Sequence, residues 1–360
     1  MTNAPHFLHP ADLHEALWLR SRGRALEIGS ATTPSPGESE VVIRARAVAV
    51  NPIDALGGFA RWVVLPWLTY PAVLGSDVAG EIVAVGARVE GLKVGDRVVG
   101  YAVGVERSRN AAAEGAFQTH VTLMASMCAR LPDSLSFTDA CVLPLALTTA
   151  AAGLFEQDQL ALELPTTPTT RRDATVLIFG AATSVGMNAV QLAHNAGYRV
   201  VATASTKNFP LIHSLGADVL VDYHDSDLVD QVVRHLDGHN LVGTLAIASG
   251  SLRTAIAVST ARGTADGRRI SSAHPTPVTT IRGRIARRRG ITVSAIWGGS
   301  PKDTDLGSAL WNGYVSRALA DGTHRAVPSA NVVGHGLSAI PRALTRVKNG
   351  AQAEKFVVTL

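Results

Sequence analysis

The alternation of hydrophobic and polar positions separates a β-rich first part from a second part in which short apolar strands alternate with helices. In the first part, Val41–Val50 partly alternates with a period of two residues. Further short strands are predicted at Val78–Val85, Arg97–Tyr101 and Phe117–Leu123. Glycines punctuate these segments at short intervals, which is typical of a small, irregular barrel rather than of parallel βαβ repeats.

The period changes at Ser136, which stands three residues before Asp139 as in a capping box. An apolar, alanine-rich helix is predicted from there to Phe155, with a kink at Pro144. The polar, proline-containing residues 163–173 are predicted to form a surface loop.

From Ala174 onward, the regular alternation of apolar strands with helices predicts a doubly wound parallel sheet. The strands are expected near Val176, Val200, Val219, Leu245, Ile270 and Val293. Helices follow at Asp305–Ala320 and at Leu337–Lys348, the second closed by Gly350, before a last strand at Lys355–Leu360. We therefore expect an α/β protein whose final segment returns to the first domain.

The segment from Thr175 to Ser205 has the pattern of a dinucleotide-binding βαβ unit. An apolar strand, V-L-I-F, enters the small-residue turn G-A-A-T-S-V-G, which is followed by a helix and a second apolar strand. Ala181, Thr183 and Gly186 stand where the G-x-G-x-x-G fingerprint has its glycines, so the motif alone is weak. We expect a pyrophosphate to bind at the start of this helix. The expected contacts are Ala181, Ala182, Thr183, Ser184, Val185 and Gly186.

The second strand of this unit, Arg199–Ala204, ends in A-S-T-K-N and not in the acidic residue that would bind a free ribose 2′-hydroxyl. Ser205, Lys207 and Asn208 offer polar groups and a cation there, so the expected cofactor is NADPH rather than NADH. The alternative is that Lys207 is simply a solvated residue at the start of the next helix.

Composition limits the class of protein. The chain has 360 residues, which suggests two domains, and its 46% hydrophobic and 17% charged residues describe a core-rich globular protein. No uninterrupted apolar run has the length of a membrane span, and the start lacks the pattern of a signal peptide, so we expect a cytoplasmic protein. The two cysteines, Cys128 and Cys141, provide neither a disulfide framework nor a four-cysteine zinc site.

Three further segments leave alternatives open. The basic run Arg282–Arg289 suits a solvated connection between two strands, or contact with nucleic acid or an acidic carrier protein; the absence of interleaved aromatic residues favours the first. Phe59–Trp67 suits a pocket wall, a core segment or a partner surface. An exposed strand near Val293 would allow pairing across a dimer, and a monomer is equally compatible.

Several motifs, in this order along nearly the whole chain, resemble the medium-chain dehydrogenase/reductase superfamily. They are N-P-I-D at 51–54, L-G-S-D-V-A-G-E-I-V-A-V-G at 74–86, G-L-K-V-G-D-R-V at 91–98, E-G-A-F at 114–117, the nucleotide unit and L-G-A-D at 215–218. Within the superfamily, Pro144–Phe155, A-T-S-V-G and D-Y-H-D at 222–225 are most similar to zinc-independent enoyl reductases that act in trans with polyketide synthases, and to quinone oxidoreductases.

The resemblance implies a GroES-like catalytic domain (1–145 and 311–360), a Rossmann domain (146–310) and NADPH-dependent reduction of an activated carbon–carbon double bond in the cleft between them. It also implies a small-molecule or carrier-bound unsaturated acyl substrate. A polyketide synthase or acyl carrier protein is then a possible partner, and neither nucleic acid nor a membrane is expected.

By the same resemblance, Thr148 and Thr149 lie beside the nicotinamide, where a hydroxyl would orient the ring, and Asn51 and Pro52 cover it. Tyr223 would stack on the adenine. The alternatives are that the threonines bond back to their own helix, that N-P only ends a strand, and that Tyr223 is a half-buried aromatic residue.

The reaction is expected to need no metal, because the G-H-E triplet of zinc-dependent relatives reads Gly75, Ser76, Asp77 here, and serine is a poor zinc ligand. No proton donor is evident: Ala55 and Leu56 stand where relatives carry a lysine. Tyr70 is a candidate acid but precedes Pro71 in a turn. Water, or a substrate that needs no positioned acid, would fill this role. Quinone or carbonyl reduction, and a catalytically silent nucleotide-binding accessory protein, therefore remain alternatives to enoyl reduction.

Overall fold

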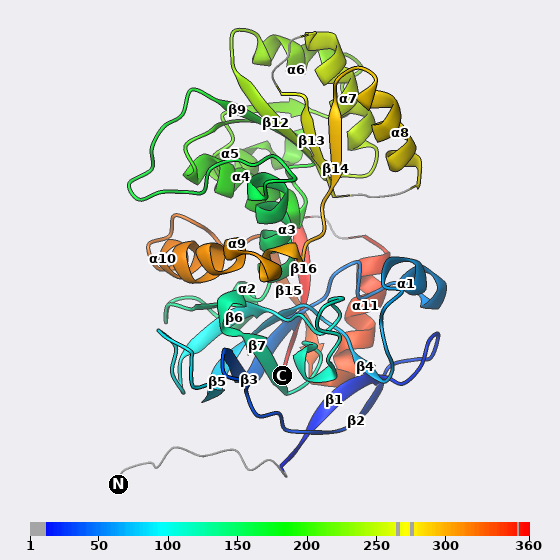
Figure 1. The fold of residues 1–360 in the computed structure, drawn as a ribbon, viewed down its shortest axis with the longest axis vertical. Helices are drawn as coiled ribbons and strands as arrows, with labels where there is room; N and C mark the ends of the chain where they lie inside the picture. The colour runs from blue at the N-terminus through cyan, green and yellow to red at the C-terminus, as the bar shows by residue number, and fades with distance from the viewer. Residues whose placement is uncertain (1–11, 264–266, 274–276, 351–352) are drawn as a thin grey trace. The chain divides into compact units, whose positions relative to one another are not determined.

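The computed structural model describes residues 12–263, 267–273, 277–350 and 353–360 (Figure 1). The chain divides into two compact units. The first consists of Met1–Leu145, Gly307–Gly322 and Ala326–Leu360, and the second of Ala146–Leu306 and Thr323–Arg325. Mostly antiparallel β-structure makes up the first unit, and a parallel sheet makes up the centre of the second.

A seven-stranded sheet forms the centre of the first unit, in the order β15-β16-β3-β5-β6-β8, with β7 also paired to β3. In chain order these strands are β3 (Glu40–Ala49), β5 (Asp77–Val85), β6 (Arg97–Tyr101), β7 (His120–Met124), β8 (Cys128–Arg130), β15 (Ser329–His335) and β16 (Glu354–Thr359). A three-stranded sheet, ordered β2-β1-β4, consists of β1 (Leu13–Leu19), β2 (Glu27–Thr32) and β4 (Ala72–Val73). The strands predicted in this region and the C-terminal strand are all present, whereas β1, β2, β4, β8 and β15 were not expected.

Gly80 lies where β5 passes closest to β3. A Cβ atom at this position would lie 2.2 Å from the carbonyl oxygen of Arg44. The register of the two strands shifts between Ala45 and Ala47, which marks a bulge beside Gly80. Glycine is therefore required here by the close approach of the two backbones.

The predicted single helix from Ser136 to Phe155 is two helices, α2 (Phe137–Ala140) and α3 (Pro144–Phe155). Ser136 caps α2 as expected, because its Oγ accepts a hydrogen bond from the Asp139 amide at 3.0 Å. Pro144 begins α3 instead of kinking a continuous helix, since proline fits the first helical turn, where its missing N–H costs no hydrogen bond.

Phe137–Phe155 is long and apolar enough to cross a membrane, with a mean hydropathy of 1.4, which the sequence analysis did not anticipate. However, 72% of its apolar stretch is buried inside the protein. A buried core helix of a globular protein has the same length and hydropathy.

The second unit contains six parallel strands in the order β11-β10-β9-β12-β13-β14. They are β9 (Thr175–Phe179), β10 (Arg199–Ala204), β11 (Val219–Asp222), β12 (Leu241–Ala246), β13 (Arg269–Ser272) and β14 (Thr292–Ala295). Besides most of α3, the helices of the unit are α4 (Ser184–Asn195), α5 (Phe209–Ser214), α6 (Leu228–Leu236), α7 (Ser251–Arg262) and α8 (Pro277–Arg287). All six predicted strands are confirmed. The strand order reverses between β9 and β12, which is the switch point where such sheets bind ligands.

The remaining helices are α1 (Gly58–Val64), α9 (Asp305–Ser308), α10 (Ser316–Ala320) and α11 (Ile340–Lys348). The helix expected at Asp305–Ala320 is interrupted by a π-helical run, Ala309–Val315, within which Trp311 and Tyr314 are both buried. Gly350 follows the end of α11 with φ +91°, as the sequence predicted. Short 3-10 turns occupy Ala112–Glu114, Ala125–Met127, Thr206–Asn208, Ser300–Asp303 and Leu337–Ala339.

A short segment of the second unit, Thr323–Arg325, is tied to α4. The Nε2 atom of His324 lies 2.9 Å from Oδ1 of Asn188, and the Arg325 amide donates to Oε1 of Gln191 at 2.7 Å. His324 and Asn188 are both buried. Burial lowers the pKa of His324 to about 3, so its ring is neutral at neutral pH.

We expect the buried ring of His324 to make the protein lose stability in mild acid. An unfolded histidine titrates near pH 6.5, so below that pH the unfolded chain binds a proton that the folded chain does not. Between about pH 7.5 and pH 5, wild type should lose about 2 kcal/mol more of its unfolding free energy than the His324→Gln variant. Urea unfolding at the two pH values measures this difference. Equal losses in both proteins would contradict it.

Candidate functional site

The turn between β9 and α4 is shaped by two glycines, Gly180 and Gly186. Gly180 has φ +86°, and a Cβ atom there would lie 2.9 Å from Cβ of Ala248. A Cβ atom on Gly186 would lie 2.2 Å from the carbonyl oxygen of Gly180. The turn therefore requires glycine at these two positions, and the fingerprint positions occupied by Ala181 and Thr183 tolerate a side chain.

Backbone amides at this turn form a cradle for an anion. The Thr183 hydroxyl caps α4 by accepting from the Gly186 amide at 3.0 Å and donating to the Gly180 carbonyl at 2.8 Å. Across the described residues, the amides of Ala182, Ser184 and Val185 donate to no protein acceptor. Three unpaired amides at the positive end of a 12-residue helix suit a pyrophosphate.

The Ala181 amide does not belong to this cradle, contrary to the expected contact. It donates to the carbonyl oxygen of Thr203 at 3.0 Å and so joins β9 to β10. Ala181 is also fully buried. Its contribution is therefore to leave room at the turn, and the first amide of the turn without a protein acceptor among the described residues is that of Ala182.

The polar residues after β10 lie at the same edge of the sheet, because the carboxyl ends of parallel strands meet there. Ser205 and Asn208 bond to each other, with Nδ2 of Asn208 donating to Oγ of Ser205 at 3.0 Å. Lys207 is exposed. These three residues thus lie in one turn, at the edge of the sheet where the carboxyl ends of the strands meet and where a bound dinucleotide would extend.

A carboxylate that the strand-end argument missed also borders this turn. Asp222, the last residue of β11, pairs with Ala204 in the parallel register, and its Oδ2 accepts from the Thr206 amide at 3.3 Å. Its Oδ1 accepts from the backbone amide and Nδ1 of His224 at 2.9 and 2.7 Å. These contacts, the His224 amide first, lower the pKa of Asp222, so the group is charged. The sequence shows Asp222 in D-Y-H-D, but only the sheet pairing places it beside residue 206.

Tyr223 is 52% exposed, so its side chain is about half-buried, and this degree of exposure is compatible with both alternatives. Its ring lies 4.0 Å from that of His224 at an interplanar angle of 36°. One face of an aromatic ring near the ends of β10 and β11 is therefore accessible to a flat ligand such as adenine.

In the first unit, a buried polar cluster joins the ends of three neighbouring strands, β16, β3 and β5. Asn51, just after β3, donates from Nδ2 to Oδ2 of Asp77 at 2.8 Å and accepts from Nζ of Lys355 at 2.8 Å. Lys355 also pairs with Oδ2 of Asp77 at 2.6 Å, and the Leu145 amide donates to its Oδ1 at 2.6 Å. The Asp77 carboxylate is fully buried and its charge is matched inside the protein by one ammonium group.

Asp54 closes the N-P-I-D turn beside this cluster. Its Oδ2 accepts from the Asn51 amide at 2.9 Å, and its own amide donates to the Asn51 carbonyl at 3.1 Å. Burial, reinforced by the charge of Asp77, raises the pKa of Asp54 to about 7. The backbone of Asn51 is thereby fixed, while Pro52 remains exposed.

The cluster also occupies the place of the G-H-E triplet of zinc-dependent relatives. Ser76 is buried, and Asp77 is bonded by Lys355, Asn51 and Leu145. Both cysteines are buried, and burial raises the pKa of Cys128 to about 12 and that of Cys141 well above its usual value. Among the described residues, no three His, Cys, Asp or Glu side chains converge on one point. These residues do not fit a zinc ion.

Thr148 and Thr149 lie on α3, where the sequence placed them. Thr148 is fully buried and Thr149 partly exposed. Of the two, Thr149 alone presents surface to a ligand. The expected roles beside a nicotinamide stay predictions.

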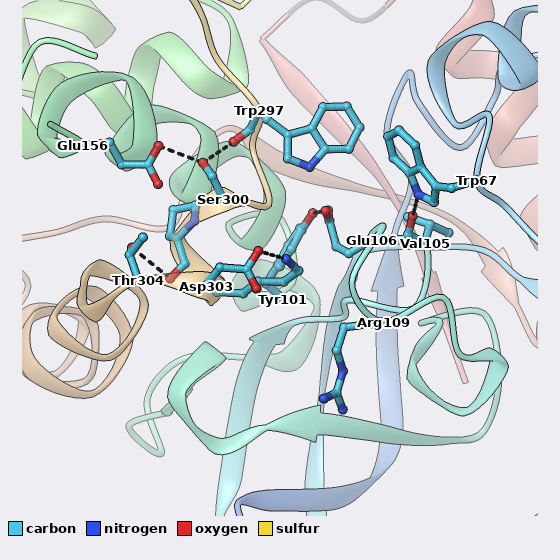
Figure 2. Close-up of polar contacts among 12 residues, drawn as sticks. Trp67, Tyr101, Val105, Glu106, Arg109, Glu156, Trp297, Ser300, Asp303 and Thr304 are labelled. Carbon is cyan, nitrogen blue, oxygen red and sulfur yellow. Dashed lines mark hydrogen bonds and ion pairs between the residues drawn. The ribbon is translucent and has the colours of Figure 1, made fainter. Parts of the chain in front are cut away.

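Sequence reasoning missed two hydrogen-bonded acids, which Figure 2 shows from both units. In the first unit, the Tyr101 hydroxyl donates to Oε1 of the buried Glu106 at 2.6 Å. In the second unit, Ser300 donates to Oε2 of Glu156 at 2.8 Å, and burial raises the pKa of Glu156. Tyr101 faces Asp77 across β5 and β6, a placement visible only once the strands are paired.

The outcome for the remaining segments is clear in three cases. The basic run Arg282–Arg289 lies between β13 and β14, in the last part of α8 and the turn after it. In Phe59–Trp67, Phe59, Trp62 and Val63 are exposed on α1, which rules out a core segment. Val293 lies on β14, an edge strand of the sheet. Burial lowers the pKa of Arg61 and the nearby Tyr70 acts in the opposite direction, and no substrate contact of Tyr70 follows from that.

Two family models match the chain. Residues 37–133 match the alcohol dehydrogenase GroES-like domain, and residues 184–310 match the zinc-binding dehydrogenase family. The chain is 40% identical to dehydrogenase azaJ of Aspergillus niger over 94% of its own length and 96% of that protein. It is 32% identical to trans-enoyl reductase himH of Aspergillus japonicus, over 97% of this chain and 98% of that one.

The fold is also shared with a solved enoyl reductase, CurK. The TM-score is 0.73 at 21% identity, over 97% of this chain and 99% of the other. With the nucleotide turn and the ordered motifs, these similarities are decisive for the family. The chain belongs to the medium-chain dehydrogenase/reductase superfamily, in its enoyl reductase and quinone oxidoreductase-like branch.

Proposed function

We propose that the protein reduces an activated carbon–carbon double bond with NADPH and without a metal ion. The observation that carries the proposal is that both oxygens of the Asp77 carboxylate are already bonded within the protein, by Lys355, Asn51 and the Leu145 amide. A zinc-dependent alcohol dehydrogenase holds an alkoxide with its metal cation, whereas here the third residue of the corresponding triplet, Asp77, is paired with the ammonium group of Lys355. An enone or enoyl thioester needs no such cation, because its developing charge is spread over an enolate.

The nucleotide cradle supports a pyridine nucleotide. The amides of Ala182, Ser184 and Val185 would hold the pyrophosphate, and Ser205, Lys207 and Asn208 would contact the adenosine 2′-phosphate. Asp222 is close to this turn, but its charge is engaged by the amides of Thr206 and His224. When bound, NADPH supplies hydride to the β-carbon of the substrate.

The protein's own residues would orient the ligands. Asn51 is held rigid between Asp77 and Lys355, so it and Pro52 would present a fixed wall to the nicotinamide. Thr149, with Thr148 behind it, would orient the ring from α3. Enolate charge would be stabilised by hydroxyl or amide donors, and water would protonate the α-carbon.

The proposed substrate is an unsaturated acyl thioester or enone of the polyketide type, free or bound to a carrier protein or a polyketide synthase. The relative himH, named a trans-enoyl reductase, supports this class. We place the reaction in the cytoplasm.

Turnover assays separate the candidate functions. We expect the protein to consume NADPH with a crotonyl thioester or a simple enone, because such substrates need no metal. Absorbance of NADPH follows the reaction. Faster loss with quinones than with enones would select quinone reduction instead. Nucleotide binding without turnover of any of these substrates would identify a silent accessory protein.

Lys207 should set the preference for NADPH. Loss of a charge-assisted contact to the 2′-phosphate costs about 1.5–3 kcal/mol, so Lys207→Ala should raise KM for NADPH by about 10- to 100-fold and leave KM for NADH unchanged. Lys93→Ala, an exposed lysine in a turn of the other unit, is the matched control. An equal effect on both nucleotides would contradict the assignment.

The buried pair of Asp77 and Lys355 predicts a specific pattern of stability. Lys355→Met leaves a buried, uncompensated carboxylate and should cost about 3–5 kcal/mol of unfolding free energy. The double variant Asp77→Asn with Lys355→Met should recover most of that loss, because no charge remains. Denaturant unfolding measures both free energies.

The metal-free mechanism has a separate test. Activity in the presence of a chelator should match activity without it. Loss of activity on chelation would contradict the metal-free mechanism.

A further inference from the structure

The helix α8 and the turn after it carry a concentration of positive charge without counter-charge. Arg282, Arg284, Arg287, Arg288 and Arg289 are all exposed, and the segment from Ile281 to Gly290 contains no acidic residue. Within the described ranges, none of these guanidinium groups forms an ion pair with a carboxylate. Elsewhere, arginines such as Arg44, Arg109 and Arg130 do pair with Glu81, Glu114 and Asp96.

An apolar stripe runs through this basic surface. Ile281 and Ile285 are one helical turn apart and are 56% and 53% exposed. The opposite side of α8 faces the sheet, because Ala286 is buried and Gly283 approaches Val293 of β14. At 100° per residue, Arg284 and Arg287 flank the stripe on one side and Arg282 on the other, and Arg288 and Arg289 follow in the turn after α8. Figure 1 shows α8 beside β14 in the second unit.

A cavity of about 260 Å³ adjoins one side of the stripe. Arg284 and Arg287 line it together with hydroxyl-bearing side chains. Those side chains are Ser272, Thr279, Thr280 and Ser294. Ser272 and Ala295, which also lines the cavity, are the last residues of β13 and β14, so the cavity reaches the same sheet edge as the nucleotide turn. Two guanidinium groups in a recess of this size suit a phosphate group.

We propose that α8 is the docking helix for an acidic carrier protein that delivers the acyl substrate, and that Arg284 and Arg287 bind the phosphodiester of the carrier's prosthetic arm. The inference rests on the proposed function. Charge complementarity selects the occupant: the five exposed arginines match an acidic surface, and the two isoleucines match a small apolar contact. Two aliphatic side chains offer little apolar area for insertion into a membrane. The segment from Ile281 to Gly290 contains no aromatic residue that could stack on nucleic-acid bases.

Steady-state kinetics with two forms of one substrate test the proposal. The 2-butenoyl group is presented on an acidic holo acyl carrier protein and, separately, on pantetheine, which lacks the phosphate. We expect the double variant Arg284→Gln with Arg287→Gln to raise KM for the carrier-bound form by about tenfold or more and to change the pantetheine form less than about twofold. The double variant Arg317→Gln with Arg342→Gln, at exposed positions of the first unit, is the control for net charge and should change neither.

Binding measurements separate the two parts of the contact. Ile281→Ser with Ile285→Ser should weaken binding of both the apo and the holo carrier, whereas the Arg284 and Arg287 variant should weaken the holo form more, because only that form has a phosphodiester. Affinity for the carrier should also fall as salt increases.

Several results would overturn the docking assignment. They are equal losses with both substrate forms, an unchanged KM for the carrier-bound form, stronger binding to anionic phospholipid vesicles than to the carrier, or a changed oligomeric state in the α8 variants. If wild type turns over neither form, the proposed reductase function fails. Titration of the carrier against wild type and the α8 variants then tests docking by itself, and an affinity that is equal in all of them overturns it.

Discussion

The structure of the first unit depends on one buried ion pair, that between Asp77 and Lys355. Asp77 begins β5 and Lys355 lies near the start of β16, and the two strands are separated by β3. The pair therefore spans three strands, and Asn51 fills the position between them. A buried carboxylate is tolerated only when its charge and its lone pairs are satisfied, and here an ammonium group, a carboxamide and the Leu145 amide do so. The pair consequently fixes the N-P-I-D turn and the start of α3 at the same point.

The nucleotide turn shows a different way to build a binding site. Its donors are backbone amides, so it does not require particular side chains, and Ala181 and Thr183 replace two of the expected glycines. Thr183 contributes by capping α4. Close approach of the chain then requires glycine only at Gly180 and Gly186, where a Cβ atom would collide with a neighbour. A motif that requires three glycines therefore fails to identify this turn as a nucleotide-binding site.

Charge is distributed unevenly over the described residues. Several arginines of the first unit lie beside carboxylates, as in the contacts of Arg44 and Arg46 with Glu81, and these contacts lower the pKa of that glutamate. The arginines of α8 have no such partners, and mutual repulsion along one helix makes this arrangement unfavourable for the isolated unit. An acidic partner would relieve that repulsion, which connects the surface of α8 to the carrier-bound substrate proposed for the active site.

The sequence by itself determined the six strands of the parallel sheet, the main strands of the β-rich unit and the cap at Ser136, because each leaves a periodic or local signal in neighbouring residues. It also placed the nucleotide turn and the family. Only the tertiary structure decided which groups meet across long separations: Asp77 with Lys355, Asp222 with the turn after β10, and Tyr101 with Asp77. It likewise showed that the Ala181 amide is bonded to Thr203 and that Arg284 borders a cavity. Strand order and register create these contacts, and neither is encoded in any short stretch of residues.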